Sequence, residues 1–115
     1  MNENNRQVLF ERIKKGDSAA IAELYKYYWR AARAAAFGVT GEINLAEDAA
    51  SEAFYRALGN LKDLRDINRF GPWLYTITIH TSKQILKNLS KEKKIKPQKQ
   101  FDSSLSTPGS RMEQQ

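Results

Sequence analysis

The feature that most constrains the fold of this 115-residue chain is a long apolar stripe with helical spacing. Within residues 21–36, apolar side chains recur at intervals of three and four residues, the pattern of one face of an α-helix. The stripe comprises Ile21, Leu24, Tyr25, Tyr28, Ala32, Ala35 and Ala36. Asp17 is a good N-cap for this helix, and Gly38 and Gly41 are expected to end it. Because the second half of the stripe is alanine-rich, a partner helix can approach it closely.

Two further helices are predicted on either side of that stripe. The first spans about residues 5–15, and Gly16 takes the C′ position after it. Its apolar positions are Val8, Leu9 and Ile13. The other begins at Asn44 and ends at Gly59. Asn44 and Glu47, three residues apart, resemble a capping box with Asn in place of Ser or Thr. Its expected buried stripe is Ala46, Ala50, Ala53, Phe54, Ala57 and Leu58.

A fourth helix is predicted after a polar loop at residues 61–69. Proline is favoured in the first turn of a helix because its missing N–H has no partner there, so the helix should begin at Gly71-Pro72 and fray near Ser90. Its inward side is expected to comprise Trp73, Leu74, Ile77, Thr81 and Ile85. The predicted fold class is therefore all-α, a compact bundle of about four helices.

The C-terminal segment differs from the rest in composition and charge. Helical periodicity is lost from Lys91 onward, so we predict a helical domain over residues 1–90 and a flexible, disordered basic linker or tail over residues 91–115. The net charge of +6 is concentrated, since seven lysines between Lys83 and Lys99 are opposed only by Glu92. Concentrated positive charge favours a polyanion, most simply nucleic acid. The alternative is a solvated lysine tail that aids solubility.

Composition also excludes several classes of function. With no cysteine and one histidine, thiolate and multi-histidine metal sites are excluded within one chain, and we expect no metal and no cofactor. The adjacent carboxylates Glu47 and Asp48 point to different sides of a helix, and no nucleophile–base pair accompanies them, so no enzymatic activity is expected. No apolar run approaches the roughly 18 residues of a membrane helix, so we expect a cytoplasmic protein without membrane insertion.

Three segments together resemble region 2 of the extracytoplasmic-function (ECF) sigma factors, the smallest sigma factors of the sigma-70 type. The first is a short helix, a Gly-Asp break and the opening of a second helix, from Leu9 to Tyr25. The second, AEDAASEAFYRAL at residues 46–58, is similar to the family's AEDLVQEVFLRAW. The third, FGPWLYTI at residues 70–77, is similar to FRAWLYRI. Each segment alone is weak, but the ordered set from Leu9 to Leu89 is specific.

The resemblance implies a bacterial RNA polymerase sigma factor that acts in transcription initiation. In the family, the helix matching residues 44–58 docks on the coiled coil of the polymerase β′ clamp. The loop and helix matching residues 61–88 meet the −10 promoter element and hold bases of the non-template strand in single-stranded form. The implied partners are core RNA polymerase and promoter DNA, with an anti-sigma factor as a further partner. The family has no catalytic activity of its own.

The residues suggest two surfaces that agree with this resemblance. On the helix from Asn44, the side chains away from the apolar stripe form an acidic strip suited to a basic partner: Glu47, Asp48, Ser51, Glu52 and Tyr55. The simpler alternative is a solvated acidic face near a helix N-terminus. The loop and fourth helix mix cations with aromatic and polar groups, as single-strand binding requires. These DNA-binding candidates are Lys62, Arg65, Arg69, Trp73, Tyr75, Thr76, Ile79, His80, Lys83 and Lys87.

Two of the DNA-binding candidates also have a structural interpretation. Trp73 stands beside Leu74 at a helix start, where a tryptophan is more often part of the core than a stacking platform, whereas Tyr75 is expected to be reachable from solvent. His80 is the only histidine and is either a partly exposed helix residue or a DNA-facing one.

Departures from the family pattern bear mainly on DNA contact. Thr76 and Ile79 stand where arginines are common in the family, and His80 replaces an asparagine. On the docking side, Ser51 replaces a glutamine and Leu58 a tryptophan. The polymerase-facing side is therefore the better matched of the two.

Other functions and a larger protein are consistent with the same sequence. A sigma mimic would keep the surface to capture an anti-sigma factor without promoter DNA, and a generic basic helical DNA-binding protein would explain the lysines but not the ordered motifs. The chain ends at Gln115, inside what resembles the linker to a domain that binds the −35 element. We expect a fragment of a longer sigma factor, the alternative being a stand-alone partner of a separate −35-binding subunit.

Overall fold

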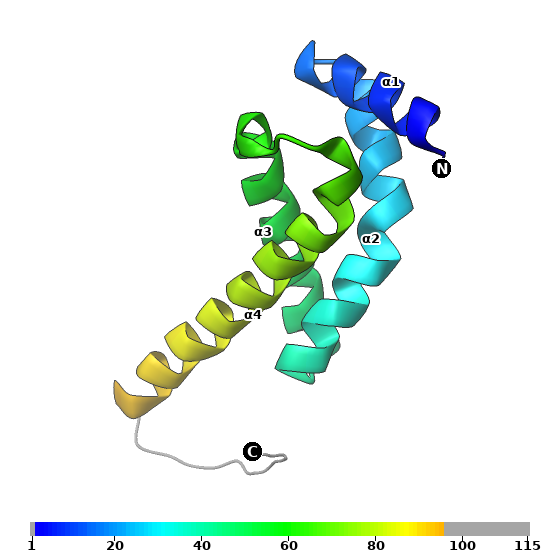
Figure 1. The fold of residues 1–115 in the computed structure, drawn as a ribbon. Helices are drawn as coiled ribbons and strands as arrows, with labels where there is room; N and C mark the ends of the chain where they lie inside the picture. The colour runs from blue at the N-terminus through cyan, green and yellow to red at the C-terminus, as the bar shows by residue number, and fades with distance from the viewer. Residues whose placement is uncertain (1, 96–115) are drawn as a thin grey trace. The chain divides into compact units, whose positions relative to one another are not determined.

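The computed structural model describes residues 2–95 (Figure 1). Its α-helices are α1 (Glu3–Lys14), α2 (Ser18–Thr40), α3 (Ile43–Gly59) and α4 (Phe70–Ile95), with the short 3-10 turns η1 (Leu61–Asp63) and η2 (Ile67–Arg69) between α3 and α4. Within the described residues there is no strand, which confirms the predicted all-α class with about four helices.

The chain divides into two units, residues 1–85 and residues 86–115. The described part of the second unit is the continuation of α4 as far as Ile95, so the helix extends beyond Ser90, where fraying was predicted. The rest of the predicted tail, residues 96–115, lies outside the described residues.

The break between α1 and α2 forms as the sequence predicts. Gly16 has a φ of 85°, a left-handed conformation that glycine adopts without a steric penalty. The side chain of Asp17 then accepts hydrogen bonds from the N–H groups of Ala19 and Ala20, at 3.0 and 3.3 Å. Arg12 Nε donates to Asp17 Oδ2 at 2.8 Å, and this hydrogen bond lowers the pKa of the carboxyl below its ordinary value. The cap at Asp17 is therefore confirmed. The predicted end of α2 is confirmed at Gly41, whereas Gly38 lies inside the helix.

The predicted start of α3 is wrong by two residues. The N-cap is Glu42, whose carboxylate accepts hydrogen bonds from the N–H groups of Asn44 and Leu45 at 3.1 and 3.0 Å. Asn44 is therefore already helical and its N–H is one of the groups being capped. Glu47 does not close a capping box, because its carboxylate is paired with Arg33 of α2 at 3.2 Å.

A seam of small side chains joins α2 to α3, which lie side by side in Figure 1. Its members are buried alanines: Ala32, Ala36, Ala46, Ala49, Ala50, Ala53 and Ala57. Because none of these side chains extends beyond Cβ, the two backbones can approach closely. This confirms the role predicted for the alanine-rich half of the stripe.

Aromatic rings tie the start of α4 to the first two helices. Phe70 is fully buried, with its ring centroid 5.1 Å from that of Phe10 and 5.0 Å from that of Tyr28, both in edge-on geometry. Burial also raises the pKa of Tyr28 above its ordinary value. Phe70 therefore fixes the point at which the loop after α3 enters α4.

The inward side of α4 is more polar than predicted. Leu74 and Thr81 are buried as expected, but so are Thr78 and Ser82, which the apolar pattern did not include. Thr78 Oγ1 donates to the carbonyl of Leu74 at 2.8 Å, and Ser82 Oγ donates to that of Thr78 at 2.7 Å. These hydroxyls are satisfied within their own helix, so they can be buried without cross-helix partners.

Candidate functional site

Four of the five predicted polymerase-contact residues lie on one exposed face of α3. Asp48, Ser51, Glu52 and Tyr55 follow i, i+3, i+4, i+7 spacing, opposite the alanine seam, and all are exposed. Tyr55 is 77% exposed, more than any other large hydrophobic side chain in the described residues. We refer to these four residues as the α3 face. It offers a planar ring, a hydroxyl and two carboxylates to a partner.

Glu47 does not belong to the α3 face. It is half-buried, and its Oε2 atom lies 3.2 Å from Arg33 Nη1 on α2. The ion pair turns the Glu47 carboxylate toward α2, but the side chain stays 43% exposed, so its contribution to the acidic strip stays a prediction. Sequence spacing alone could not show this, because the pairing depends on how α2 packs against α3.

An aromatic cluster that the sequence analysis did not predict lies beside the α3 face. The rings of Tyr25 and Trp29 on α2 are stacked, with centroids 4.9 Å apart and planes 14° from parallel. The Tyr25 ring is also 4.6 Å from that of Phe54, and its hydroxyl oxygen is 3.4 Å from Ser51 Oγ. The i, i+4 spacing of Tyr25 and Trp29 was the available signal, but the stripe assigned Tyr25 to the core, whereas it is 36% exposed.

A groove at the start of α4 gathers four of the predicted DNA-binding residues. Its volume is about 390 Å³, and its walls come from the loop after η1, from η2 and from the first turns of α4. The lining residues are Leu64, Arg65, Asp66, Arg69, Pro72, Trp73 and Thr76. Arg65, Asp66, Arg69 and Thr76 are exposed, so two guanidinium groups, a carboxylate and a hydroxyl border an open hollow. We refer to it as the loop groove.

Trp73 lies at the edge of the core beside the loop groove, and its role as a stacking platform stays a prediction. It is half-buried and packs against the core, with its ring centroid 6.0 Å from that of Phe70. The same side chain also lines the loop groove. Packing fixes the ring in place while part of it stays accessible, as a stacking platform requires.

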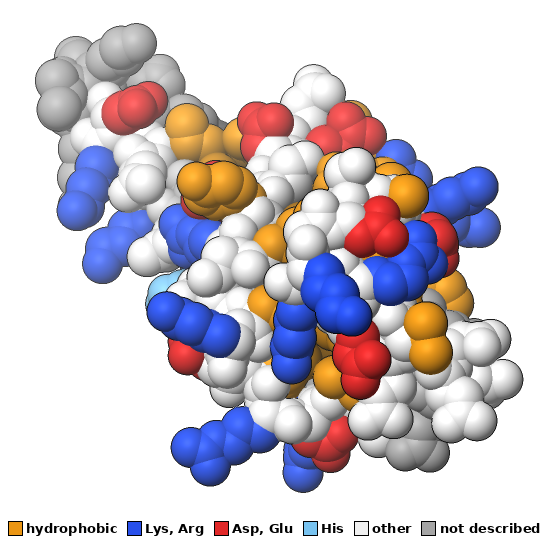
Figure 2. All heavy atoms as spheres, turned by 90° about the horizontal axis from the view of Figure 1, so that it is seen from above, with side chains coloured by type: hydrophobic (Ala, Val, Ile, Leu, Met, Phe, Trp, Pro, Cys, Tyr) orange, Lys and Arg blue, Asp and Glu red, His pale blue; other side chains and the backbone are white. Residues whose placement is uncertain are grey.

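The remaining candidates lie along α4 and η1. Thr76, Ile79, His80 and Lys83 follow i, i+3, i+4, i+7 spacing and therefore share one side of α4 that continues from the loop groove. Figure 2 shows Lys and Arg side chains beside the pale blue histidine. Of the other three candidates, Tyr75 is 58% exposed and lies on a different side of α4, while Lys62 in η1 and Lys87 in the second unit are exposed.

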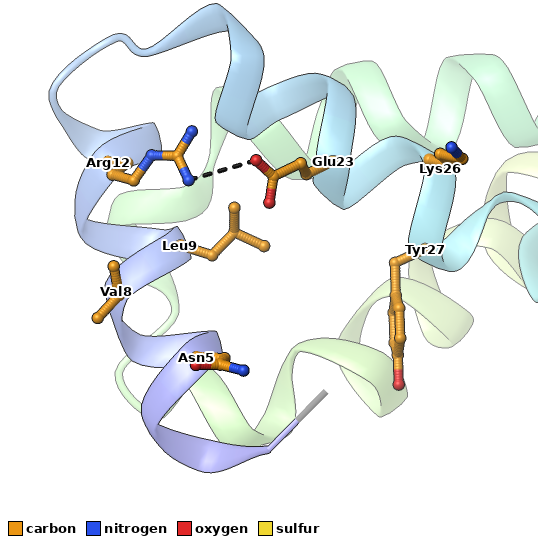
Figure 3. A pocket seen from close by; sticks show the side chains of 7 residues that line it. All are labelled: Asn5, Val8, Leu9, Arg12, Glu23, Lys26 and Tyr27. Atoms are coloured by element: carbon orange, nitrogen blue, oxygen red, sulfur yellow. Dashed lines mark hydrogen bonds and ion pairs between the residues drawn. The ribbon is translucent and has the colours of Figure 1, made fainter.

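A larger hollow lies between α1 and α2, away from every predicted site residue. It has a volume of about 750 Å³, and its lining side chains are drawn in Figure 3: Asn5, Val8, Leu9, Arg12, Glu23, Lys26 and Tyr27. Val8 is 58% exposed here, although the sequence pattern assigned it to the apolar side of its helix. Arg12 in its wall is already paired with Asp17 and Glu23.

Within residues 2–95, no group of three or more histidine and carboxylate side chains is placed to hold a metal ion. Among the described helices, none is both long and apolar enough to cross a membrane.

Known proteins similar to this chain are transcription factors of one family. The family model described as Sigma-70 region 2 matches residues 24–92. The ECF RNA polymerase sigma factor SigW of Bacillus subtilis is 41% identical over 68 residues, which is 58% of this chain and 36% of that protein. The RNA polymerase sigma-H factor of Pseudomonas aeruginosa is 35% identical over 89 residues, 75% of this chain and 45% of the relative. The ECF RNA polymerase sigma-E factor of Escherichia coli K12 is 34% identical over 82 residues, 70% of this chain and 41% of the relative.

The match is to part of each relative. The chain spans less than half the length of these three proteins. No solved structure is significantly similar to the chain.

Proposed function

Since the chain belongs to the Sigma-70 region 2 family, as the region 2 domain of an ECF sigma factor, we propose that it binds core RNA polymerase and single-stranded promoter DNA on two separate surfaces. The α3 face docks on the β′ clamp, and the loop groove with the adjoining side of α4 holds the non-template strand of the −10 element. It acts in the cytoplasm, where RNA polymerase works, and we propose no catalytic step.

The chemistry of the α3 face supports a basic helical partner. Asp48 has no ion pair among the described residues, so its carboxylate is open to a cationic partner. Glu52 is paired with Arg56 at 3.1 Å but remains 46% exposed. Tyr55 adds a large ring that loses most of its contact with water on docking, and tyrosine is enriched at such interfaces.

The loop groove supports capture of an extruded base. A base must leave the stack at a cost of a few kcal/mol before it can enter a pocket. Stacking on an aromatic ring returns about 1–3 kcal/mol per base, and the anchored Trp73 is the ring available here. Arg65 and Arg69, which line the groove, would pair with the phosphates on either side of that base.

The observation that carries the proposal is the gathering of Arg65, Arg69, Trp73 and Thr76 around one hollow. These residues come from a loop and a helix whose sequence favours single-strand binding. A randomised pool of single-stranded oligonucleotides, selected on the complex of this chain with core polymerase, tests it. The proposal predicts enrichment of a defined sequence.

Two pairs of variants separate the surfaces. Asp48→Arg is expected to lower polymerase affinity at least tenfold, whereas Glu11→Arg, the same charge change at an exposed site on α1, leaves it unchanged. Arg69→Ala is expected to weaken oligonucleotide binding and reduce its salt slope by about 0.7, the value for one single-strand phosphate contact. Arg30→Ala, on an exposed part of α2, is the control. His80→Ala is expected to change the selected sequence.

Three outcomes contradict parts of the proposal. Absence of polymerase binding by the unaltered chain rejects it entirely. Polymerase binding without enrichment of any oligonucleotide sequence rejects the DNA surface and favours the sigma mimic. An equal effect of Asp48→Arg and Glu11→Arg rejects the α3 face as the docking site.

A further inference from the structure

A pair of exposed cations on α2 takes no part in the proposed function. Lys26 and Arg30 are one helical turn apart, and neither has an ion pair among the described residues. We refer to these two residues as the basic row. Both line a hollow of about 510 Å³ whose wall also includes Ile21, Tyr25 and Trp29. The basic row therefore borders an apolar surface that is open to a partner.

Two stacked aromatic rings lie between the basic row and the α3 face. They belong to Tyr25 and Trp29, each of which precedes a member of the basic row in the sequence. On their other side the two rings lie beside that of Phe54 on α3, with centroids 4.6 and 6.4 Å away, and the Tyr25 hydroxyl oxygen is 3.4 Å from Ser51 Oγ. The surface therefore passes from carboxylates on α3, across aromatic rings, to cations on α2.

The charges on the two helices have the same spacing but run in opposite directions. Asp48 and Glu52 of the α3 face, which we call the acidic row, have the i, i+4 spacing of the basic row. A short turn reverses the chain between α2 and α3, and the ion pair between Arg33 and Glu47 sets the register of the two helices (Figure 1). Residue numbers therefore rise along the basic row as they fall along the acidic row.

Such a surface is complementary to itself. A two-fold axis that passes through the aromatic rings, perpendicular to the surface, brings the basic row of one copy onto the acidic row of the other. Because the same axis reverses the helix direction, Lys26 faces the partner's Asp48 and Arg30 faces the partner's Glu52. Each of these pairs occurs twice, as in any two-fold interface.

We propose that this chain forms a symmetric dimer through this surface. A basic helix alone satisfies the acidic row but is repelled by the basic row, whereas a second copy satisfies both. The rings of Tyr25, Trp29 and Tyr55 lose contact with water in the dimer, as aromatic side chains do at the centre of interfaces. One consequence rests on the proposed function: the dimer covers the α3 face, so only the monomer docks on polymerase.

Charge reversal followed by mixing tests the dimer on the chain alone. Sedimentation equilibrium of the unaltered chain should show a reversible rise with concentration from the mass of one chain to that of two. Lys26→Glu places two carboxylates opposite each other and Asp48→Lys places two cations opposite each other, so each is expected to weaken self-association at least about tenfold. In an equimolar mixture the two introduced side chains face each other and the second pair is unaltered. Association in the mixture should therefore return to within about threefold of that of the unaltered chain.

Matched variants on α1 separate this interface from a general effect of charge. Lys14→Glu and Glu11→Lys make the same charge changes at exposed positions that line neither the hollow nor the α3 face. They are expected to leave self-association unchanged, both alone and mixed. Recovery on mixing also excludes misfolding as the cause of dissociation, because a misfolded variant is not restored by another variant.

Three results overturn the dimer. They are an unaltered chain that stays monomeric up to about 1 mM, a mass that rises beyond two chains as head-to-tail contacts produce, and a mixture that fails to recover association.

The masking of the α3 face is tested separately. At a concentration where the unaltered chain is dimeric, Lys26→Glu should occupy a larger fraction of core polymerase than the unaltered chain, and equal occupancy overturns the masking. Failure of the proposed function appears instead as absence of polymerase binding at low concentration, where the unaltered chain is monomeric. That result leaves the self-association measured on the chain alone unaffected.

Discussion

Replacing Phe70 tests whether the loop groove depends on the aromatic cluster beneath it. Phe70 is the first residue of α4 and is 0% exposed, in edge-on contact with Phe10 and Tyr28. Replacing a buried phenylalanine with alanine lowers the free energy of unfolding by about 3–5 kcal/mol. A unit of this size is stable by only about 4–13 kcal/mol, at about 0.05–0.15 kcal/mol per residue. Phe70→Ala is therefore expected to remove a large part of that stability.

Phe70→Leu is the more informative change, because the site stays filled. It removes three ring–ring contacts, with Phe10, Tyr28 and Trp73, each worth about 0.5–1.5 kcal/mol beyond burial, so the expected loss is about 1.5–4.5 kcal/mol. Urea unfolding followed by far-UV circular dichroism measures the free energy of unfolding, provided that the m-value stays constant. Tyr75→Leu is the control, an aromatic residue on the same helix that is 58% exposed.

The same variant links stability to the site. The ring centroids of Phe70 and Trp73 are 6.0 Å apart. Loss of the Phe70 ring should therefore free the Trp73 indole, shift the fluorescence emission of Trp73 to longer wavelength and weaken oligonucleotide binding. A Phe70→Leu variant that loses no more stability than Tyr75→Leu, within about 0.5 kcal/mol, would refute the argument. So would a stability loss with unchanged oligonucleotide affinity, because the groove would then be independent of the cluster.

Three further predictions concern caps and backbone. Glu42→Ala should lower the free energy of unfolding, measured by urea unfolding, by about 0.5–2 kcal/mol, whereas Asn44→Ala should have little effect. A larger loss for Asn44→Ala than for Glu42→Ala would show that Asn44 is the N-cap after all. The hydrogen bond from Arg12 lowers the pKa of Asp17, so the ionised carboxyl stabilises the fold at neutral pH, and this contribution is lost as the pH falls through the lowered folded-state pKa. Asp17→Asn should therefore flatten the fall in melting temperature between pH 5 and pH 2, and an unchanged acid profile would contradict this. Gly71→Ala should change the free energy of unfolding by less than about 1 kcal/mol in either direction, because the added Cβ meets the Tyr28 ring at 3.7 Å, an ordinary contact, but Pro72 disfavours helical geometry for a preceding residue that has a Cβ. A larger loss in urea unfolding would show that the helix start cannot accept a side chain.

The helices were predictable because their signals are local. Gly16 and Asp17 mark the α1–α2 break through backbone conformation and capping, which depend on neighbouring residues only. The start of α3 was misplaced because glutamate is a weaker N-cap signal than asparagine, so the sequence favoured Asn44 over Glu42. Thr78 and Ser82 were missed because a hydroxyl that bonds its own backbone can be buried like an apolar group, and periodicity counts only apolar side chains.

The site was predictable as a set of residues but not as an arrangement. Family motifs selected Asp48, Glu52 and Trp73, and helix spacing placed the first two on one face. The pairing of Glu47 with Arg33 and the reach of Arg56 to Gln84 depend on how separate helices meet, which no local pattern encodes. The loop groove likewise forms only when the turn after α3 folds against the start of α4.

The alanine seam between α2 and α3 has a consequence for how such a protein can diversify. At each of its positions a larger side chain would push two backbones apart, so substitution there is restricted to the smallest residues. The outward side chains of α3 and α4 meet no such limit and can change one at a time while the scaffold stays the same. The surface of a small helical unit of this kind can therefore diverge without repacking of its interior.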